Sequence, residues 1–160
     1  MLYCREGALG WEWTEVKNIR PEVMPPMKIR TVDHEAWQER GFRVPRTMAN
    51  EVCEMLEDRI KAGIMERSDG PYRNPWFLVK KKNGKYRLII GAMKMNSVTL
   101  RDANMPPDAD EFAEDFAGCK VVTLMDLFSE YDQILLDPTS RDITAIQTPK
   151  ELLRMTRLVQ

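Results

Sequence analysis

Five basic side chains crowd a short stretch near the middle of the chain: Lys80, Lys81, Lys82, Lys85 and Arg87. Asn83-Gly84 separates two strand-like runs, 76–82 and 85–90, and predicts a β-hairpin because both turn residues tolerate positive φ. In strand geometry the cations then lie within about 10 Å of one another. Such a surface suits phosphate groups, and the planar guanidinium of Arg87 is able to bind one through two hydrogen bonds. The alternative is an edge strand whose lysines prevent aggregation.

A single carboxylate is the second chemical feature, since Asp126 ends the apolar run 121–125. A charge at the end of a buried strand is costly unless it caps a turn or meets a metal ion. The residues alone leave both roles open. Tyr131 follows five positions later, close enough to flank the same site.

Several elements are expected to position these groups. Residues 48–63 predict the clearest helix, with Thr47 as N-cap and Gly63 as stop, and with Ile64 and Met65 packed under its end. The acidic stretch 102–118 predicts a second, shorter helix with Phe112 and Phe116 facing inward.

The remaining segments are expected to be extended. Residues 119–125 predict a buried strand paired antiparallel with 131–136, and 143–147 and 152–159 predict two further strands. The Pro- and Trp-rich residues 1–47 predict an extended segment that wraps onto the rest.

Composition bounds the class of protein. The chain has 160 residues, 43% of them hydrophobic, and a net charge of −1, which fits a globular protein. No apolar run of membrane-spanning length and no secretory leader are visible, and the three cysteines form no C-x-x-C pair. We therefore expect an intracellular protein, in cytoplasm or nucleus, that is not secreted and has no membrane partner. The neutral total conceals segregation: eight basic residues and no acid in 70–101, then six acids and no base in 102–118.

Three motifs together resemble one family. Residues 71–87 resemble the fingers hairpin of retroelement reverse transcriptases, and 124–134 resemble their L-D-L-x-S-G-Y-x-Q-I palm motif. Residues 144–158 are similar to the next segment of gypsy-type long-terminal-repeat retrotransposons, notably fungal ones. The resemblance implies an α+β fold: a partial polymerase with an antiparallel palm sheet, a fingers hairpin and two helices. It divides the chain into a connector (1–36), a fingers-like region (37–118) and a proximal palm (119–160).

The resemblance also implies roles at the metal and nucleotide sites. Asp126 matches the first of three catalytic, metal-binding aspartates, and Leu127 matches the neighbour whose backbone carbonyl reaches a metal. Mg²⁺, or Mn²⁺, is the implied cofactor of the complete enzyme. Lys81 and Arg87 match the cations that hold the triphosphate, and Tyr131 matches the residue under the incoming sugar.

Further roles concern the nucleotide and the nucleic acid. Gln160 matches the glutamine of L-P-Q-G, another nucleotide contact. Phe77 and Asn96 match positions that face the template, and Lys80 and Lys82 are the accompanying cations for nucleic acid. The implied partners are an RNA or DNA template-primer, deoxynucleoside triphosphates and the remainder of the polyprotein.

Departures from the pattern indicate a truncated, degenerate copy. The Y-x-D-D motif with the other two aspartates is not present in this sequence. Glu130 and Glu151 stand where the family has glycines, and Val159 stands where it has proline. We expect a fragment of an RNA-directed DNA polymerase that is inactive alone. The alternatives are a non-catalytic nucleic-acid-binding remnant and a pseudogene product without function.

Overall fold

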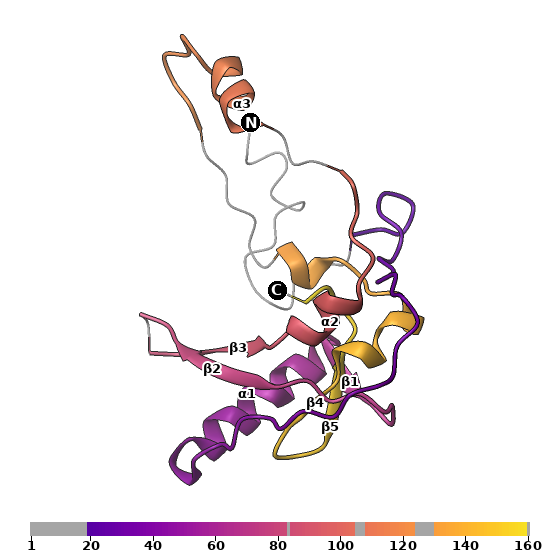
Figure 1. Ribbon diagram of the computed structural model, residues 1–160. Coiled ribbons are helices and arrows are strands. Elements are labelled where there is room, and N and C mark those ends of the chain that lie inside the picture. The colour runs from indigo at the N-terminus through magenta and orange to yellow at the C-terminus, as the bar shows by residue number, and fades with distance from the viewer. Residues whose placement is uncertain (1–18, 83, 105–107, 124–129, 160) are drawn as a thin grey trace.

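The computed structural model describes residues 19–82, 84–104, 108–123 and 130–159 (Figure 1). Its helices are α1 (Ala49–Lys61), α2 (Met93–Val98) and α3 (Ala109–Asp115), with 3-10 turns η3 (Arg46–Met48), η4 (Glu130–Gln133), η5 (Pro138–Ser140) and η6 (Asp142–Thr144). Its strands are β1 (Met65–Arg67), β2 (Trp76–Lys80), β3 (Tyr86–Ile90), β4 (Ile146–Gln147) and β5 (Leu152–Met155). All named strand pairs are antiparallel, which confirms the α+β class. The short helix α2 was not expected.

The core lies between a small sheet and α1. The sheet has the order β1-β5-β4, and Met65 lies opposite Met155 while Ile146 lies opposite Leu153. Side chains alternate along β5, so that Leu153 and Met155 are buried against the apolar face of α1. Helix and sheet therefore bury one shared apolar cluster, to which the hairpin contributes Trp76 and Ile90.

Helix α1 confirms the predicted helix but not its N-cap. Thr47 lies within the 3-10 turn η3, and the N-cap residue Met48 makes no side-chain cap bond. The turn starts directly after Pro45, so the helical backbone begins before Thr47 is in a position to cap it. The predicted stop is correct: Gly63 has φ +67°, and the N–H of Ile64 returns to the carbonyl of Arg59 at 2.9 Å.

The predicted hairpin is present, with a longer turn than Asn-Gly alone implied. In β2 and β3 the register pairs Trp76 with Ile90 and Lys80 with Tyr86. The N–H of Lys81 bonds the carbonyl of Lys85 at 2.7 Å, and Gly84 N–H bonds the carbonyl of Lys81 at 3.0 Å. Three residues rather than two lie between the paired Lys81 and Lys85, and Gly84 takes φ +85°. This pattern matches a three-residue loop closed by a glycine bulge.

The described part of the N-terminal segment is extended and runs along the body (Figure 1). Isolated bridges join Met27 to Leu136 and Thr31 to Thr99. The N–H of Ile29 also bonds the hydroxyl of Ser140 at 3.0 Å. Residues 1–18 of the predicted extended segment lie outside the described residues.

The acidic helix forms but does not pack inward. In α3 the Asp108 carboxylate caps the N-terminus by accepting hydrogen bonds from the N–H groups of Asp110 and Glu111. Phe112 and Phe116 are 58% and 44% exposed, and their rings contact each other with centroids 4.8 Å apart. The expected inward orientation is wrong because α3 stands away from the body, with no described sheet face beside it (Figure 1).

Two predicted strands of the last third are absent from the described residues. Residues 119–123 form no strand, and Val121 and Val122 are 83% and 64% exposed. The expected partner 131–136 instead begins in η4, and it makes only isolated bridges, from Leu135 to Arg157 and from Leu136 to Met27. Without a bonded neighbour an apolar run has no ladder to join, so its β-propensity is not realised.

The other two strands are shorter than predicted. The run 143–147 begins inside the turn η6, with Ile143 and Thr144, so that β4 covers only Ile146–Gln147, and β5 ends at Met155. Thr144 explains the turn, because its hydroxyl donates to the carbonyl of Arg141 at 2.6 Å. Residues 140–142 form a tight connection, since η5 and η6 follow each other there.

Candidate functional site

The hairpin has one face toward the core and one toward solvent. Trp76, Leu78, Leu88 and Ile90 all pack in or against the core cluster. Strand alternation turns Phe77, Val79 and Arg87 to the opposite side, where Phe77 is 46% and Val79 44% exposed. Arg87 lies directly opposite Val79 in the register. The same alternation carries Lys81 to this side, through its backbone bond to Lys85. We call Phe77, Val79, Lys81 and Arg87 the outer face.

Lys80 and Lys82 do not share the outer face. Lys80 pairs with Tyr86 on the other side of the hairpin, and Lys82 follows within the loop. The lysine run is therefore divided by the period of the strand. Lys80, Lys81, Lys82 and Arg87 are all exposed, and none forms an ion pair with a described residue. Their charge is available to an external anion.

The base of the hairpin is held firmly to the rest of the molecule. Asn74 is fully buried and accepts a hydrogen bond from the Trp37 indole N–H at 2.9 Å. Its amide donates to the carbonyls of Ile143 at 2.7 Å and Ala145 at 3.0 Å. The side chain thus joins the N-terminal segment, the hairpin and the approach to β4. Such a satisfied buried amide fixes the direction in which the hairpin leaves the body.

The other predicted site residues are dispersed. Asn96 lies exposed on α2, which follows β3, and Tyr131 lies in η4 with 45% exposure. Asp126, Leu127 and Gln160 lie outside the described residues. The structure therefore brings Phe77, Lys81 and Arg87 together on one face, whereas the remaining assignments stay predictions.

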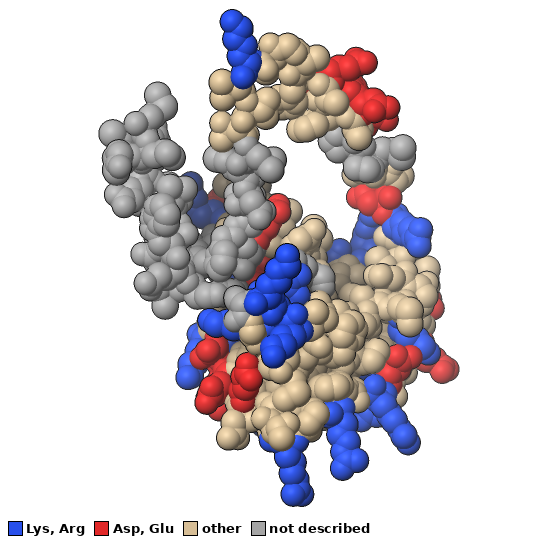
Figure 2. Space-filling view, turned by 90° about the vertical axis from the view of Figure 1, so that its left-hand side faces the viewer, with Lys and Arg blue, Asp and Glu red and all other residues tan. Residues whose placement is uncertain are grey.

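Charge is only partly segregated in three dimensions. Figure 2 shows acidic side chains, with one basic side chain nearby, at the height of α3, whereas basic and acidic side chains both project from the body. Among the described residues, no group of three or more His, Cys, Asp or Glu side chains is placed to hold a metal ion. No helix in the described part of the chain is long and apolar enough to cross a membrane.

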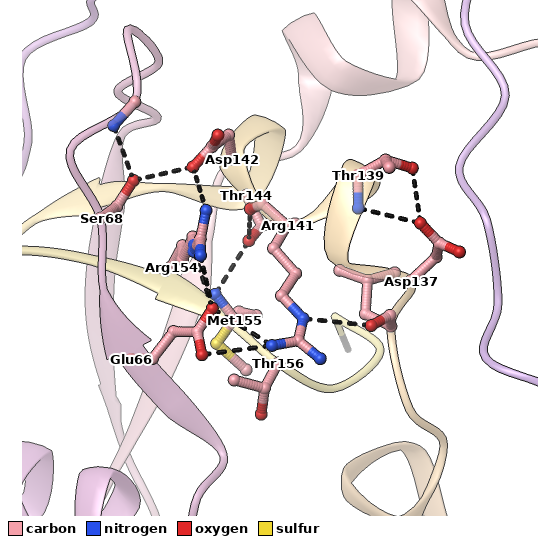
Figure 3. Close-up of polar contacts among 12 residues, drawn as sticks. Glu66, Ser68, Asp137, Thr139, Arg141, Asp142, Thr144, Arg154, Met155 and Thr156 are labelled. Carbon is pink, nitrogen blue, oxygen red and sulfur yellow. Dashed lines mark hydrogen bonds and ion pairs between the residues drawn. The ribbon is translucent and has the colours of Figure 1, made fainter.

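The structure contains a network of ion pairs that the sequence did not predict (Figure 3). The Glu66 carboxylate on β1 accepts two hydrogen bonds of 3.2 Å from Nη1 of Arg141 and is paired with Arg154 on β5 at 2.8 Å. Arg154 also donates to Oδ1 of Asp142 at 2.6 Å, and the Ser68 hydroxyl donates to that same Asp142 oxygen at 3.0 Å. Residues 66 and 154 lie 88 positions apart, so no local sequence signal marks the contact. The network ties β1 to β5 and to the turn at η6.

These features define a class of fold. The structure is similar to part of the prototype foamy virus protease-reverse transcriptase, with a TM-score of 0.71, 18% identity, and coverage of 86% of this chain and 18% of that chain. A foamy viral protease-reverse transcriptase solved with an RNA/DNA hybrid gives a TM-score of 0.69 at 15% identity, covering 92% of this chain and 21% of that one. The fold is therefore of the partial polymerase type.

Sequence relatives agree with the fold. The chain is 32% identical over 137 residues to the retrovirus-related Pol polyprotein from transposon 412 of Drosophila melanogaster, covering 82% of this chain and 11% of the polyprotein. It is 30% identical over 129 residues to the enzymatic polyprotein of Cauliflower mosaic virus (strain D/H), covering 78% of this chain and 17% of that protein. No protein-family model matches. The homologues of this chain are thus retroelement and viral polyproteins, of which it spans a small part.

Proposed function

We propose that this chain is the fingers and proximal palm of the reverse transcriptase in a gypsy-type retrotransposon polyprotein. The observation that carries the proposal is the outer face, where the register of β2 and β3 places Phe77, Lys81 and Arg87 together. Homology to retroelement polyproteins and the polymerase-type fold support it.

The outer face suits a nucleotide and a nucleic-acid strand. Arg87 and Lys81 have no ion-pair partner among the described residues, so they are available for a triphosphate. An aromatic ring that is 46% exposed, as in Phe77, offers a stacking surface for a base. Asn96 is the second residue proposed to face the template, and Tyr131 and Gln160 are proposed nucleotide contacts.

The metal site is proposed from the sequence. The Asp126 carboxylate and the Leu127 carbonyl would hold Mg²⁺, or Mn²⁺, in the complete polymerase. When bound, such ions stabilise the charge on the attacking and leaving oxygens of nucleotidyl transfer. The 160 residues contain no Y-x-D-D motif, so this chain alone supplies one of the three expected carboxylates.

Binding of a labelled RNA/DNA hybrid at several salt concentrations tests the proposal. With four to six phosphate contacts, a plot of the logarithm of the binding constant against the logarithm of the salt concentration is expected to have a slope of roughly −3 to −6. Replacing Lys81 and Arg87 by Ala should reduce the slope by about 2, one for each lost contact. The matched control replaces Lys28 and Lys61, exposed cations on other segments. Equal losses in both double variants would refute a specific role for the outer face.

A second function, nucleic-acid binding without catalysis, is favoured by one observation. The exposed cations sit on a hairpin whose base is anchored by Asn74, so binding there needs no metal site. The substitution Asp126→Ala should then leave hybrid binding unchanged. A longer chain from the same reading frame that contains Y-x-D-D separates the two functions. Primer extension by it, abolished by Asp126→Ala, supports the polymerase, whereas binding without extension supports the second function.

A further inference from the structure

A pocket of about 510 Å³ lies at the end of α1, beside β1 and the segment that follows β5. Three arginines line it, Arg67 from β1, Arg141 from the turn between η5 and η6, and Arg157. Glu66 is the acid in the wall. The resemblance to reverse transcriptases gives no role to these residues. The pocket is built by α1, β1 and the chain after β5, and none of its lining residues belongs to the outer face.

Arg157 is the unusual member of the pocket. Its residue is only 8% exposed, and its Nε and Nη1 have no hydrogen-bond partner in the part of the chain that the structure describes. The residues on either side of it are bonded to the segment 134–136, because Leu136 N–H bonds the carbonyl of Thr156 at 2.9 Å and Leu158 N–H bonds that of Ile134 at 3.0 Å. A buried guanidinium with unused donors costs folding free energy unless an acceptor meets it.

The neighbouring charges do not supply that acceptor. Glu66 already accepts hydrogen bonds from both Arg141 and Arg154, which occupies its two oxygens (Figure 3). Arg67 forms ion pairs elsewhere: its Nε lies 3.5 Å from a carboxylate oxygen of Asp69 and 3.8 Å from one of Glu151. Burial and the like charge of Arg141 lower the pKa of Arg157, whereas the negative charge of Asp132 raises it. Asp132 makes no ion pair within 4 Å among the described residues, and burial raises the pKa of its own carboxyl.

We propose that this pocket binds a phosphate group through Arg157, with Arg141 and Arg67 as further lining residues. Arginines from separate segments suit a tetrahedral, multiply charged anion whose oxygens point in several directions. The one carboxylate of the pocket wall, Glu66, is already engaged by two guanidiniums, those of Arg141 and Arg154. The same chemistry is offered by free phosphate and by the backbone of a polynucleotide.

Thermal or urea unfolding of the whole chain in phosphate, against chloride at equal ionic strength, tests the site. Phosphate at ten times its dissociation constant should lower the unfolding equilibrium constant about tenfold. The substitution Arg157→Met should abolish this gain, while in chloride it should match or exceed the stability of the unmodified protein, because a buried unpaired charge has been removed. Arg46→Met, which removes an exposed arginine of η3, should keep the full gain.

Phosphorus NMR line width of inorganic phosphate, titrated with unmodified protein, gives a readout that does not depend on a variant folding. Broadening that Arg157→Met eliminates supports the site. An unphosphorylated oligothymidine, added to the Lys81→Ala/Arg87→Ala background, then distinguishes the sources. Displacement of phosphate by the oligonucleotide indicates that the site binds the backbone of a polynucleotide, and no displacement indicates that it binds free phosphate. No phosphate-specific stabilisation or broadening, or equal effects in Arg157→Met, would overturn the proposal and leave the proposed polymerase function untouched.

Discussion

The indole nitrogen of Trp76 lies 2.6 Å from the carbonyl oxygen of Gln147 and donates a hydrogen bond to it across 71 positions of sequence. The bond joins the first residue of β2 to the last residue of β4. Gly41 packs over the same indole, where an added Cβ would lie 2.9 Å from Nε1. The hairpin thus leaves the body from a point fixed by the sheet and by the N-terminal segment. This fixed base determines the direction in which the outer face points.

Asn74 is expected to be indispensable for stability. Asn74→Leu keeps the side-chain volume but leaves the Trp37 indole N–H and the carbonyl of Ile143 without this hydrogen-bond partner. The carbonyl of Ala145 loses the side-chain amide and keeps only the backbone N–H of residue 74 as a donor. The expected loss is about 3 kcal/mol or more in the free energy of unfolding, measured by urea denaturation. Asn50→Leu on exposed α1 surface is the control. Equal stability of the two variants would show that the buried amide does not organise the junction.

Glu66 is expected to hold β1 against β5 and the η6 turn. Glu66→Gln removes the charge shared by Arg141 and Arg154. Because the carboxylate is partly exposed, we expect a loss of only about 1–2 kcal/mol, smaller still in molar salt. Glu54→Gln, on an exposed position of α1, should change little. A loss that is the same at low and high salt would argue against an ionic origin.

Asp137 is expected to make stability depend on acid pH. Hydrogen bonds from the side chain and backbone of Thr139 lower the pKa of Asp137 from its ordinary 3.8, with smaller help from Lys28 and Arg141. A lowered folded-state pKa means that this stabilisation is present above pH 3.8 and is lost as the pH falls through the folded-state pKa.

The difference in unfolding free energy between the unmodified protein and Asp137→Asn reports this directly. It should be constant near neutral pH and shrink below pH 3.8. Asp58→Asn, at an exposed carboxylate of α1, is the matched control. A difference that grows on acidification would reverse the sign of the argument.

Hydrogen exchange should separate the core from the exposed segment. Amides of β5, around Leu153 and Met155, and of α1 are expected to exchange slowly because they are bonded within the core cluster. Amides of Val121 and Val122 should exchange fast, since these residues lie in no strand and are exposed. Slow exchange at 121–123 in a monodisperse monomer would contradict the described structure.

The 160-residue chain is not expected to polymerise. In the proposed assignment it supplies only Asp126 of the three carboxylates that two-metal chemistry requires, since it has no Y-x-D-D motif. Primer extension on an RNA template with Mg²⁺ or Mn²⁺ should give the same background for the chain and for Asp126→Ala. Incorporation above that of the variant would show that this chain carries a complete site.

Local sequence determined the elements whose signals are local. Helix α1 follows from apolar spacing ended by Gly63, because periodicity and a positive φ are encoded within one stretch. The hairpin follows from Asn83-Gly84 between two β-prone runs, and the motifs around it identified the class of polyprotein. Exposure of the cations Lys81 and Arg87 followed from the same alternation.

Tertiary structure alone decided what depends on distant partners. Whether 119–123 becomes a strand depends on a bonded neighbour, and none is present among the described residues, so an apolar run stays exposed. The Glu66–Arg154 pair and the Asn74 junction join residues tens of positions apart, which no local pattern encodes. No local pattern marks Arg157 as buried, and its exposure of only 8% follows from the packing of the chain. Burial and pairing are properties of the packed chain, whereas turn and helix preferences belong to the residues themselves.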